Sequence, residues 1–324
     1  MRTATSEGKA RLVRVDTPVE GVVLYRVVRE DLPRNQYIMV CDEVLEIHTK
    51  PWLCGEKLHE LAREVAVKFL KVLYHELPLR GVPLSRLCEL TIMSGGMYYM
   101  IDEAFKDVFG RSLQRCIVGA KRYPMGDGAW DVDISYENFE ALPDRAIVIV
   151  GDTIATGATL SGSLLRLKQA ALEKGYRVDK VAVLTISGAV EGSRRLRKVE
   201  EEFRKTWKDF ELYVFNCCAL FGLEPNGTDM PYGHPDTIAP EDVVSTVNER
   251  LTPQLARRLC SIFDWGDRTK NPEKHLRELV ELAERLRHEC SDDGCLKVLD
   301  IIKAKASEEL KARMNPVALR HRHE

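Results

Sequence analysis

Residues 146–160 combine an apolar strand, an acidic residue and a small polar turn. A β-branched run at 147–150 is followed by Gly151 and Asp152. A strand, a tight turn and a helix N-terminus present backbone N–H groups to a phosphate, and glycine lets the backbone approach closely. Because Gly-Lys-Ser/Thr is absent, this turn differs from the nucleotide P-loop. We predict a phosphate site here, the alternative being an ordinary turn of an α/β sheet. The residues of the turn are Ala155, Thr156, Gly157, Ala158 and Thr159.

Three further turns follow predicted strands and are rich in small or cationic residues. Taken singly, each has an ordinary interpretation, because glycine pairs are common at strand ends and loop cations are usually solvated. Parallel strands, however, place their carboxyl ends and their ligands at one edge of the sheet. Together with the 155–159 turn, they predict one anion-binding site. The three turns are Ser94-Gly95-Gly96, Lys121-Arg122 and residues 187–192.

The elements that position these turns are strands that alternate with helices. Such alternation is typical of an α/β fold with a mainly parallel, doubly wound sheet. The stretch 121–143 is interpreted as a long polar loop. Apolar runs predict strands at 90–93, 115–119, 146–150, 181–186 and 212–215, and helical spacing predicts helices at 56–77, 97–109, 160–174 and 191–208.

Three regions follow one another along the chain. Residues 1–56 form an N-terminal β-rich segment, residues 57–239 the α/β core, and residues 240–324 a helical C-terminal extension. We expect the apolar residues of the extension to form contacts in a homo-oligomer, most simply a dimer. The strands expected in the first region are 11–15, 21–28, 37–41 and 44–48, and the apolar positions of the extension include Leu276, Leu279, Leu282, Leu286, Leu296, Leu299 and Ile302.

Composition limits the class of protein and its partners. The 324 residues are 44% hydrophobic, which suffices for a sizeable core, and the net charge of −2 offers no broad basic field for nucleic acid or a membrane. No apolar run reaches the roughly 20 residues that span a bilayer. The N-terminus lacks an apolar signal core, so a cytoplasmic protein is expected. The nine cysteines are expected to be buried, reduced thiols, although Cys290 and Cys295 flank a short turn and could form a local disulfide.

Residues 58–233 resemble the type I phosphoribosyltransferases and are most similar to the uracil type. The likeness is most specific at Ala155-Thr156-Gly157, which reproduces the Ala-Thr-Gly of that family's loop for phosphoribosyl pyrophosphate (PRPP). Ala189-Val190-Glu191-Gly192 is similar to the family's Ala-Pro-Glu-Gly. Residues 136–143 resemble its Tyr-containing lead-in, which ends in Leu-Pro.

The resemblance implies a type I phosphoribosyltransferase sheet and an activity in nucleotide salvage. The reaction would be Mg²⁺-assisted transfer of the phosphoribosyl group of PRPP to a nucleobase, with a uracil-like pyrimidine as acceptor. Asp152 would be the catalytic carboxylate, residues 155–159 would bind the 5′-phosphate, and residues 123–133 would be the lid. The pyrophosphate would lie against Ser94, Gly95, Gly96, Lys121 and Arg122, and the base against Gly227, Thr228 and Asp229.

The chain departs from the family pattern at three places. The Ser94-Gly95-Gly96 turn lacks the Arg of the uracil type, Gly151 replaces the first acidic residue of the PRPP loop, and residues 222–233 replace the family's Gly-Leu-Gly-Asp-Ala-Gly-Asp-Arg. The loss of one acidic residue at position 151 would also be compatible with a regulator that binds PRPP or a nucleotide without turning it over. A third interpretation is an enzyme that uses PRPP with an amine or another small nucleophile.

Overall fold

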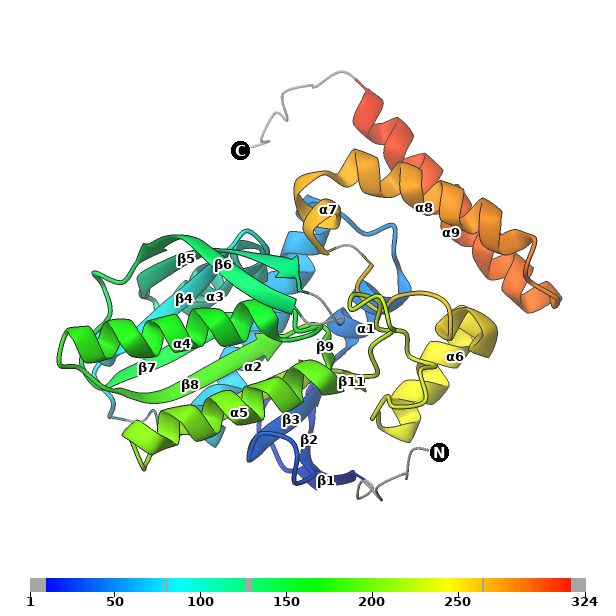
Figure 1. Cartoon of the computed structure of the whole chain (residues 1–324). Coiled ribbons are helices and arrows are strands. Elements are labelled where there is room, and N and C mark those ends of the chain that lie inside the picture. The colour runs from blue at the N-terminus through cyan, green and yellow to red at the C-terminus, as the bar shows by residue number, and fades with distance from the viewer. Residues whose placement is uncertain (1–9, 78, 80, 126–129, 264, 316–324) are drawn as a thin grey trace.

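The computed structural model describes residues 10–77, 79, 81–125, 130–263 and 265–315, and its main element is a nine-stranded sheet (Figure 1). The strand order is β1-β2-β3-β10-β8-β7-β4-β5-β6. The strands are β1 (Arg11–Val15), β2 (Val23–Val28), β3 (Asn35–Val40), β4 (Leu87–Met93), β5 (Gln114–Pro124), β6 (Trp130–Asn138), β7 (Ala146–Gly151), β8 (Val178–Thr185) and β10 (Glu211–Cys217).

The centre of this sheet is parallel and both of its edges are antiparallel. From β3 to β5 every neighbouring pair is parallel, whereas β1, β2 and β3 pair antiparallel at one edge and β5 pairs antiparallel with β6 at the other. The α/β class and the mainly parallel sheet are therefore confirmed. The strands of the N-terminal segment join the same sheet as the core through the β3–β10 pair.

Helices cover both faces of the sheet. In Figure 1, α4 (Ala158–Glu173) and α5 (Val190–Thr206) lie in front of the sheet, and α2 (Glu56–Glu76) and α3 (Ile101–Phe109) lie behind it. Burial on both faces of the sheet explains why the sequence of strand β7 is uniformly apolar. Ile147 and Ile149 belong to the core cluster that includes α2 and α3, whereas Val148 and Val150 belong to the cluster that includes α4 and α5. A strand buried on both faces has no polar side.

The C-terminal extension is helical, as predicted. It comprises α6 (Glu241–Ala256), α7 (Trp265–Lys270), α8 (Pro272–Arg287) and α9 (Asp293–Met314), and a Cys290–Cys295 disulfide joins the turn between α8 and α9. The remaining cysteines are free thiols, and all except the half-buried Cys260 are buried.

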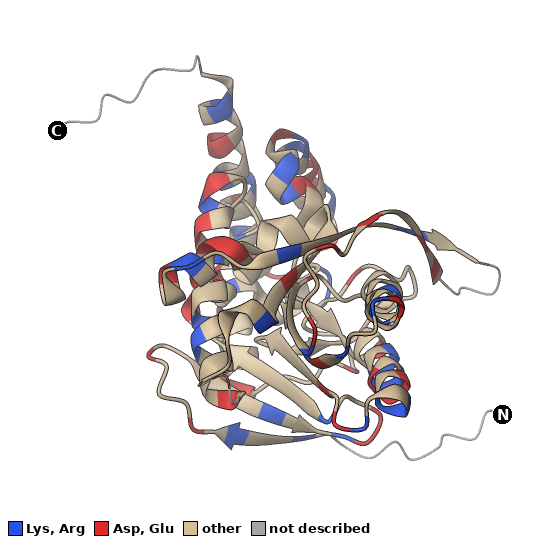
Figure 2. Cartoon of the chain, turned by 90° about the vertical axis from the view of Figure 1, so that its left-hand side faces the viewer, with Lys and Arg blue, Asp and Glu red and all other residues tan. Residues whose placement is uncertain are grey.

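Most apolar side chains of the extension pack within the chain. Leu276, Leu279, Leu286, Leu299 and Ile302 are all at most 7% exposed and belong to the core cluster that includes α2. These residues therefore give no support to the expected dimer, which stays a prediction. In Figure 2, basic and acidic residues are interspersed along the helices of the extension. Within the described ranges, no helix is both long and apolar enough to cross a bilayer.

Two predicted elements were wrong. Residues 44–48 are not a strand but part of α1 (Asp42–Thr49), a helix with acidic residues in its first turn, where they favour the helix dipole. The 121–143 loop is largely a hairpin, because β5 continues to Pro124 and β6 begins at Trp130. The alternation of apolar and polar residues from Trp130 to Tyr136 is the strand signal that the loop interpretation overlooked. Residues 126–129 of the expected lid lie outside the described residues.

A smaller difference concerns the helix predicted at 97–109. A 3₁₀ turn, η2 (Gly95–Tyr99), comes first, and α3 begins only at Ile101. Met100 between them has a left-handed backbone with φ of 56°, which interrupts the helix. Two short strands, β9 (Gly188–Ala189) and β11 (Leu220–Phe221), form a separate parallel pair, and a single 3₁₀ turn, η1 (Leu84–Arg86), precedes β4.

A buried arginine attaches the extension to the rest of the chain. Arg268 on α7 is fully buried, and its guanidinium donates hydrogen bonds to four carbonyl oxygens at distances of 2.9–3.3 Å. Burial lowers its pKa to about 10, so it stays charged at neutral pH. These carbonyls belong to Ile47, Lys50, Leu53 and Ile262.

Replacing this arginine tests the attachment. We expect Arg268→Met to lower the free energy of unfolding by on the order of 3 kcal/mol or more, because several carbonyl groups lose their donor. The measurement is urea denaturation followed by circular dichroism. The control is Arg277→Met on the exposed side of α8, which should change stability by no more than about 0.5 kcal/mol. Equal losses in the two variants would contradict the anchoring role.

Candidate functional site

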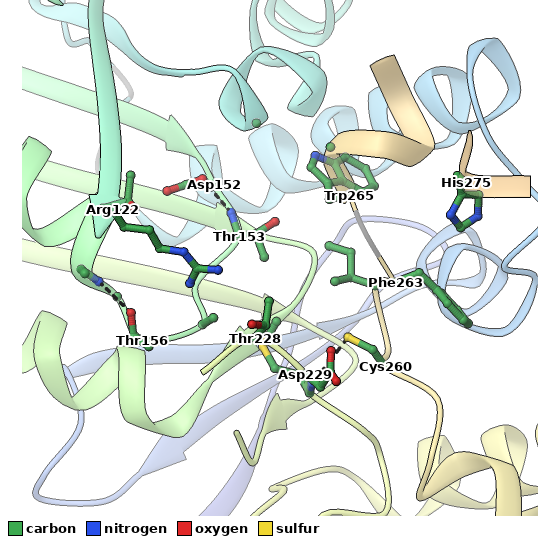
Figure 3. Close-up of a pocket in the computed structure, with 18 of the residues that line it drawn as sticks. Arg122, Asp152, Thr153, Thr156, Thr228, Asp229, Cys260, Phe263, Trp265 and His275 are labelled. Atoms are coloured by element: carbon green, nitrogen blue, oxygen red, sulfur yellow. Dashed lines mark hydrogen bonds between the residues drawn. The ribbon is translucent and has the colours of Figure 1, made fainter. Parts of the chain in front are cut away.

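The carboxyl ends of β4, β5 and β7 open into a cavity of about 660 Å³, and the C-terminal extension forms the opposite wall (Figure 3). The sheet side contributes Met93, Gly95, Arg122, Asp152, Thr153 and residues 155–159. The segment after β11 contributes Thr228, Asp229 and Met230. The extension contributes Arg258, Cys260, Ile262, Phe263, Trp265, Gly266, His275, Glu278, Leu279, Leu282 and Arg285.

The turn predicted to bind phosphate lies at the N-terminus of α4, and all of residues 155–159 line the cavity. Gly157 is the residue before the helix and has a φ of +73°, a conformation that favours glycine. Gly192 packs behind it so closely that a Cβ on Gly157 would lie 2.8 Å from the Gly192 carbonyl oxygen. The first N–H groups of a helix lack acceptors within the helix, so this turn can present them to an anion.

Of the two cations predicted at this site, Arg122 lines the cavity and Lys121 does not. Successive residues of a strand face opposite sides, so β5 can aim one of the pair at the cavity while the other, Lys121, is exposed. The Arg122 guanidinium lies 4.8 Å from the centre of the Trp130 ring on β6 and donates a hydrogen bond of 3.3 Å to the Gly227 carbonyl. The hairpin and the segment after β11 thus hold the guanidinium in place.

Asp152 follows β7 and is 8% exposed. Its Oδ1 accepts a hydrogen bond of 2.9 Å from the backbone N–H of Thr153, and its buried Oδ2 has no partner among the described residues. Burial raises the pKa of Asp152 to about 7, and the charge of Arg122 acts in the opposite direction. The carboxyl group therefore changes charge near neutral pH.

The unpartnered oxygen of Asp152 also bears on metal binding. Within the part of the chain that the structure describes, no three His, Cys, Asp or Glu side chains gather into a ligand set. Mg²⁺ is commonly held by one or two carboxylates together with substrate phosphates and water. The free Oδ2 of Asp152 fits that mode of binding.

The Ser94-Gly95-Gly96 turn contributes only Gly95 to the cavity lining. Gly96 packs against the backbone of Gly151, where an added Cβ would lie 2.9 Å from the carbonyl oxygen. Ser94 is exposed and does not line the cavity either.

Tyr99 explains why position 151 is a glycine. The fully buried Tyr99 packs against Gly151, and a Cβ built at position 151 would lie 2.4 Å from the Cβ of Tyr99. The Tyr99 hydroxyl is hydrogen-bonded to Thr153 at 2.9 Å and accepts a bond from the Ile186 N–H at 3.3 Å. An aromatic ring thus fills the space that a side chain at position 151 would need.

The expected base-binding residues are partly brought to the cavity. Thr228 and Asp229 line it, whereas Gly227 contributes through the carbonyl that receives the Arg122 hydrogen bond. The carboxylate of Asp229 accepts a hydrogen bond of 2.8 Å from Asn226, and the Asn226 side chain in turn accepts from the Asp229 N–H at 3.0 Å. This local ring of bonds shapes the segment.

The fourth turn, residues 187–192, does not line the cavity. Ser187 is hydrogen-bonded to His48 at 3.2 Å and to Ser261 at 3.0 Å, and His48 is bonded to Tyr232 at 2.7 Å. Burial lowers the pKa of His48 to about 3, so its ring is neutral. This turn therefore does not join the other three in the lining of the cavity.

Sequence patterns alone do not identify the residues that the extension supplies. Phe263 and Trp265 lie between α6 and α8 and reach the cavity from the side opposite Arg122 and Asp152 (Figure 3). His275 on α8 also lines it and is hydrogen-bonded to the Pro51 carbonyl at 2.8 Å. No recurring spacing marks these residues, and only the presence of two aromatic residues between predicted helices could have indicated them.

Comparison with known proteins gives weak structural likenesses only. No protein-family model matches the chain, and no curated protein matches it. Among solved structures, a hypoxanthine phosphoribosyltransferase from Staphylococcus aureus is similar over 51% of this chain and 75% of its own, with 16% sequence identity and a TM-score of 0.29. Similarity at this level carries no argument about the family, the activity or the acceptor base of this chain.

The raised pKa of Asp152 predicts that the free energy of unfolding depends on pH. Between about pH 4 and pH 7 the folded protein keeps a proton that the unfolded chain has released, so stability falls as the pH rises through this window. Asp152→Asn removes this dependence and should be more stable than the wild type at pH 8, by on the order of 1–3 kcal/mol. Urea denaturation at pH 4.5 and pH 8 measures it, with the exposed Asp209→Asn as control. A variant no more stable at pH 8 than the wild type would be evidence against the buried, unpartnered carboxylate.

The contact between Tyr99 and Gly151 predicts that a second acidic residue cannot simply be restored. Gly151→Ala should lose about 1–3 kcal/mol of stability through overpacking, and Gly151→Asp at least as much. The control is Gly95→Ala, whose added Cβ would meet nothing nearer than 3.9 Å. Thermal unfolding of the three variants makes the comparison, and similar melting temperatures would show that the Tyr99 ring does not restrict position 151.

Proposed function

We propose that this chain transfers the phosphoribosyl group of PRPP to a ring nitrogen of a nucleobase, releasing pyrophosphate and forming a nucleoside monophosphate. A uracil-like pyrimidine is the proposed acceptor. The observation that supports the proposal most is the meeting, in one cavity, of the 155–159 turn, the Arg122 guanidinium and the buried Asp152 carboxyl group.

The reaction requires the bond between C1 of ribose and the pyrophosphate oxygen to break while a bond from the base nitrogen to C1 forms. Positive charge develops on the ribose ring in an oxocarbenium-like transition state, as it does in glycoside cleavage. The backbone N–H groups of residues 156–159 anchor the 5′-phosphate and thereby fix the position of C1. Holding both reactants in this way can contribute on the order of 7–11 kcal/mol to lowering the barrier.

Arg122 is proposed to neutralise the charge of the departing pyrophosphate, assisted by the backbone of Gly95. Its guanidinium is already held by Trp130 and Gly227, so little reorganisation is needed when charge develops. Bound Mg²⁺ would add further positive charge beside the pyrophosphate. Asp152 would hold it there through Oδ2, which has no partner among the described residues.

The ionised carboxylate of Asp152 is proposed to stabilise the cationic ribose. Its location after β7 puts it in the same cavity as the 155–159 turn, which fixes the sugar. Residues of the β5–β6 hairpin act as the lid that excludes water, since water would hydrolyse PRPP. Thr228 and Asp229 face the base from the segment after β11.

A sensor that binds PRPP or a nucleotide without turnover is the second candidate. The observation that favours it is the packing of Tyr99 against Gly151, which leaves Asp152 as the one acidic residue at the end of β7. A site with a single carboxylate can still bind the phosphates through the turn and Arg122. It has less negative charge with which to stabilise the ribose cation.

Measurement of pyrophosphate release distinguishes the two functions. Purified protein is incubated with Mg²⁺, PRPP and each of the common nucleobases, and PRPP binding is measured separately by calorimetry. Release with at least one base supports the transferase. PRPP binding without release supports the sensor, and the absence of both contradicts the phosphate site itself.

The neighbouring cations of β5 provide a matched pair of variants. Arg122→Gln should reduce the rate of pyrophosphate release by about 10²-fold, because a prepositioned charge at the leaving group is lost. Lys121→Gln, one residue away but exposed and outside the cavity, should stay within about twofold of the wild type. Equal effects of the two substitutions would remove Arg122 from the proposed mechanism.

A further inference from the structure

Trp265 closes the cavity on the side of the extension, and its polar atom has no partner in the part of the chain that the structure describes. The residue is 5% exposed, and its indole nitrogen, Nε1, is buried without a hydrogen-bond acceptor among the described residues. Of the described side chains that bury an unpartnered polar atom, Asp152 and Trp265 are the two that line this cavity. One offers a carboxylate oxygen and the other an N–H donor.

The position of the indole is fixed by the fold. Arg268, three residues further along α7, is bound to four backbone carbonyls, and the N–H of Gly55 donates to the Arg268 carbonyl at 2.8 Å. The Trp265 ring packs against Tyr99 with 5.4 Å between ring centres. In Figure 3 the indole nitrogen lies on the edge of the ring that faces Asp152 and Thr153. The donor is therefore directed toward the space between the two walls.

The surroundings of Trp265 suit a flat, largely apolar ligand. Ile262, Phe263 and Met230 line the cavity beside it, and aromatic or aliphatic side chains of this kind cover the faces of planar rings. A single neutral N–H in such a place favours a hydrogen-bond acceptor over a second donor. An acceptor would also satisfy a buried donor that otherwise carries a free-energy cost.

We propose that Trp265 determines the acceptor specificity of the cavity by donating its indole N–H to a ring carbonyl oxygen of the acceptor base. The inference rests on the proposed phosphoribosyl transfer and names the substrate class, an oxo-substituted planar heterocycle. A base with an amino group at the corresponding position opposes one donor with another and is discriminated against. The C-terminal extension, rather than the segment at 227–229 alone, thus recognises the base.

Two pairs of bases test this assignment, because uracil and cytosine, like hypoxanthine and adenine, differ by a carbonyl oxygen in place of an amino group. The wild type should release pyrophosphate with at least one oxo base at a kcat/KM at least tenfold above that of its amino partner. Trp265→Phe keeps an aromatic ring and removes the donor. This variant should lower the ratio of kcat/KM for the oxo base to kcat/KM for its amino partner about tenfold. It should do so by raising the KM for the oxo base, while the KM for PRPP stays unchanged.

Trp207→Phe is the matched control, because Trp207 packs near α5 and not in the cavity. It should behave as the wild type. A second measurement does not need an active Trp265 variant. Among the four indole N–H signals in a ¹⁵N–¹H NMR spectrum, assigned with Trp52→Phe, Trp130→Phe and Trp207→Phe, the Trp265 signal should move downfield when the oxo base binds.

The outcomes separate this inference from the proposed function. If the wild type neither binds PRPP nor releases pyrophosphate, the proposed function fails, and the acceptor assignment fails with it. If the wild type is active but Trp265→Phe keeps the same oxo-to-amino ratio, or the Trp265 signal does not move, phosphoribosyl transfer stands and the role of Trp265 is overturned.

Discussion

The buried guanidinium of Arg268 is the interaction on which the shape of the cavity depends. A charge taken out of water is tolerated only where hydrogen bonds replace its hydration. Here the replacements come from Ile47 in α1, from the chain just after α1 and from Ile262 just before α7. Those segments cannot separate without leaving the charge unsatisfied. Arg268 thereby holds α7, and Trp265 with it, opposite the carboxyl ends of the strands.

A second buried polar network also holds distant segments of the chain together. Hydrogen bonds join four side chains from distant parts of the chain, namely those of His48, Ser187, Tyr232 and Ser261. Because burial keeps the His48 ring neutral down to about pH 3, this network keeps its charge state over the pH range in which Asp152 titrates. The carboxyl group of Asp152 can therefore change its charge while the hydrogen-bond network around His48 keeps its own.

The sequence predicted the parts of the fold that local patterns determine. The apolar run of β7 and the spacing in α2 and α4 identified these elements to within a few residues, and the 155–159 turn was located at the N-terminus of α4. The strand prediction at 44–48 was wrong because a short run of apolar residues fits a strand or a helix equally well. The sequence did not identify Trp265, because its place in the cavity depends on packing between regions more than 100 residues apart. The same holds for the Tyr99 ring that excludes a side chain from position 151.

The two polar groups in the cavity that lack partners among the described residues carry a free-energy cost in the free protein, and a ligand that bonds to them would remove that cost. Nearly all buried polar groups in folded proteins are hydrogen-bonded. A carboxylate oxygen and an indole N–H that both lack a partner among the described residues are therefore unfavourable in the free protein. An Asn or a Phe at these positions would be easier to accommodate. The two groups come from opposite walls, and they are chemically complementary to a ligand that has positive charge or hydroxyl donors at one end and a carbonyl oxygen at the other. In the proposed reaction, a ribose that becomes cationic while an oxo base attacks it carries both features.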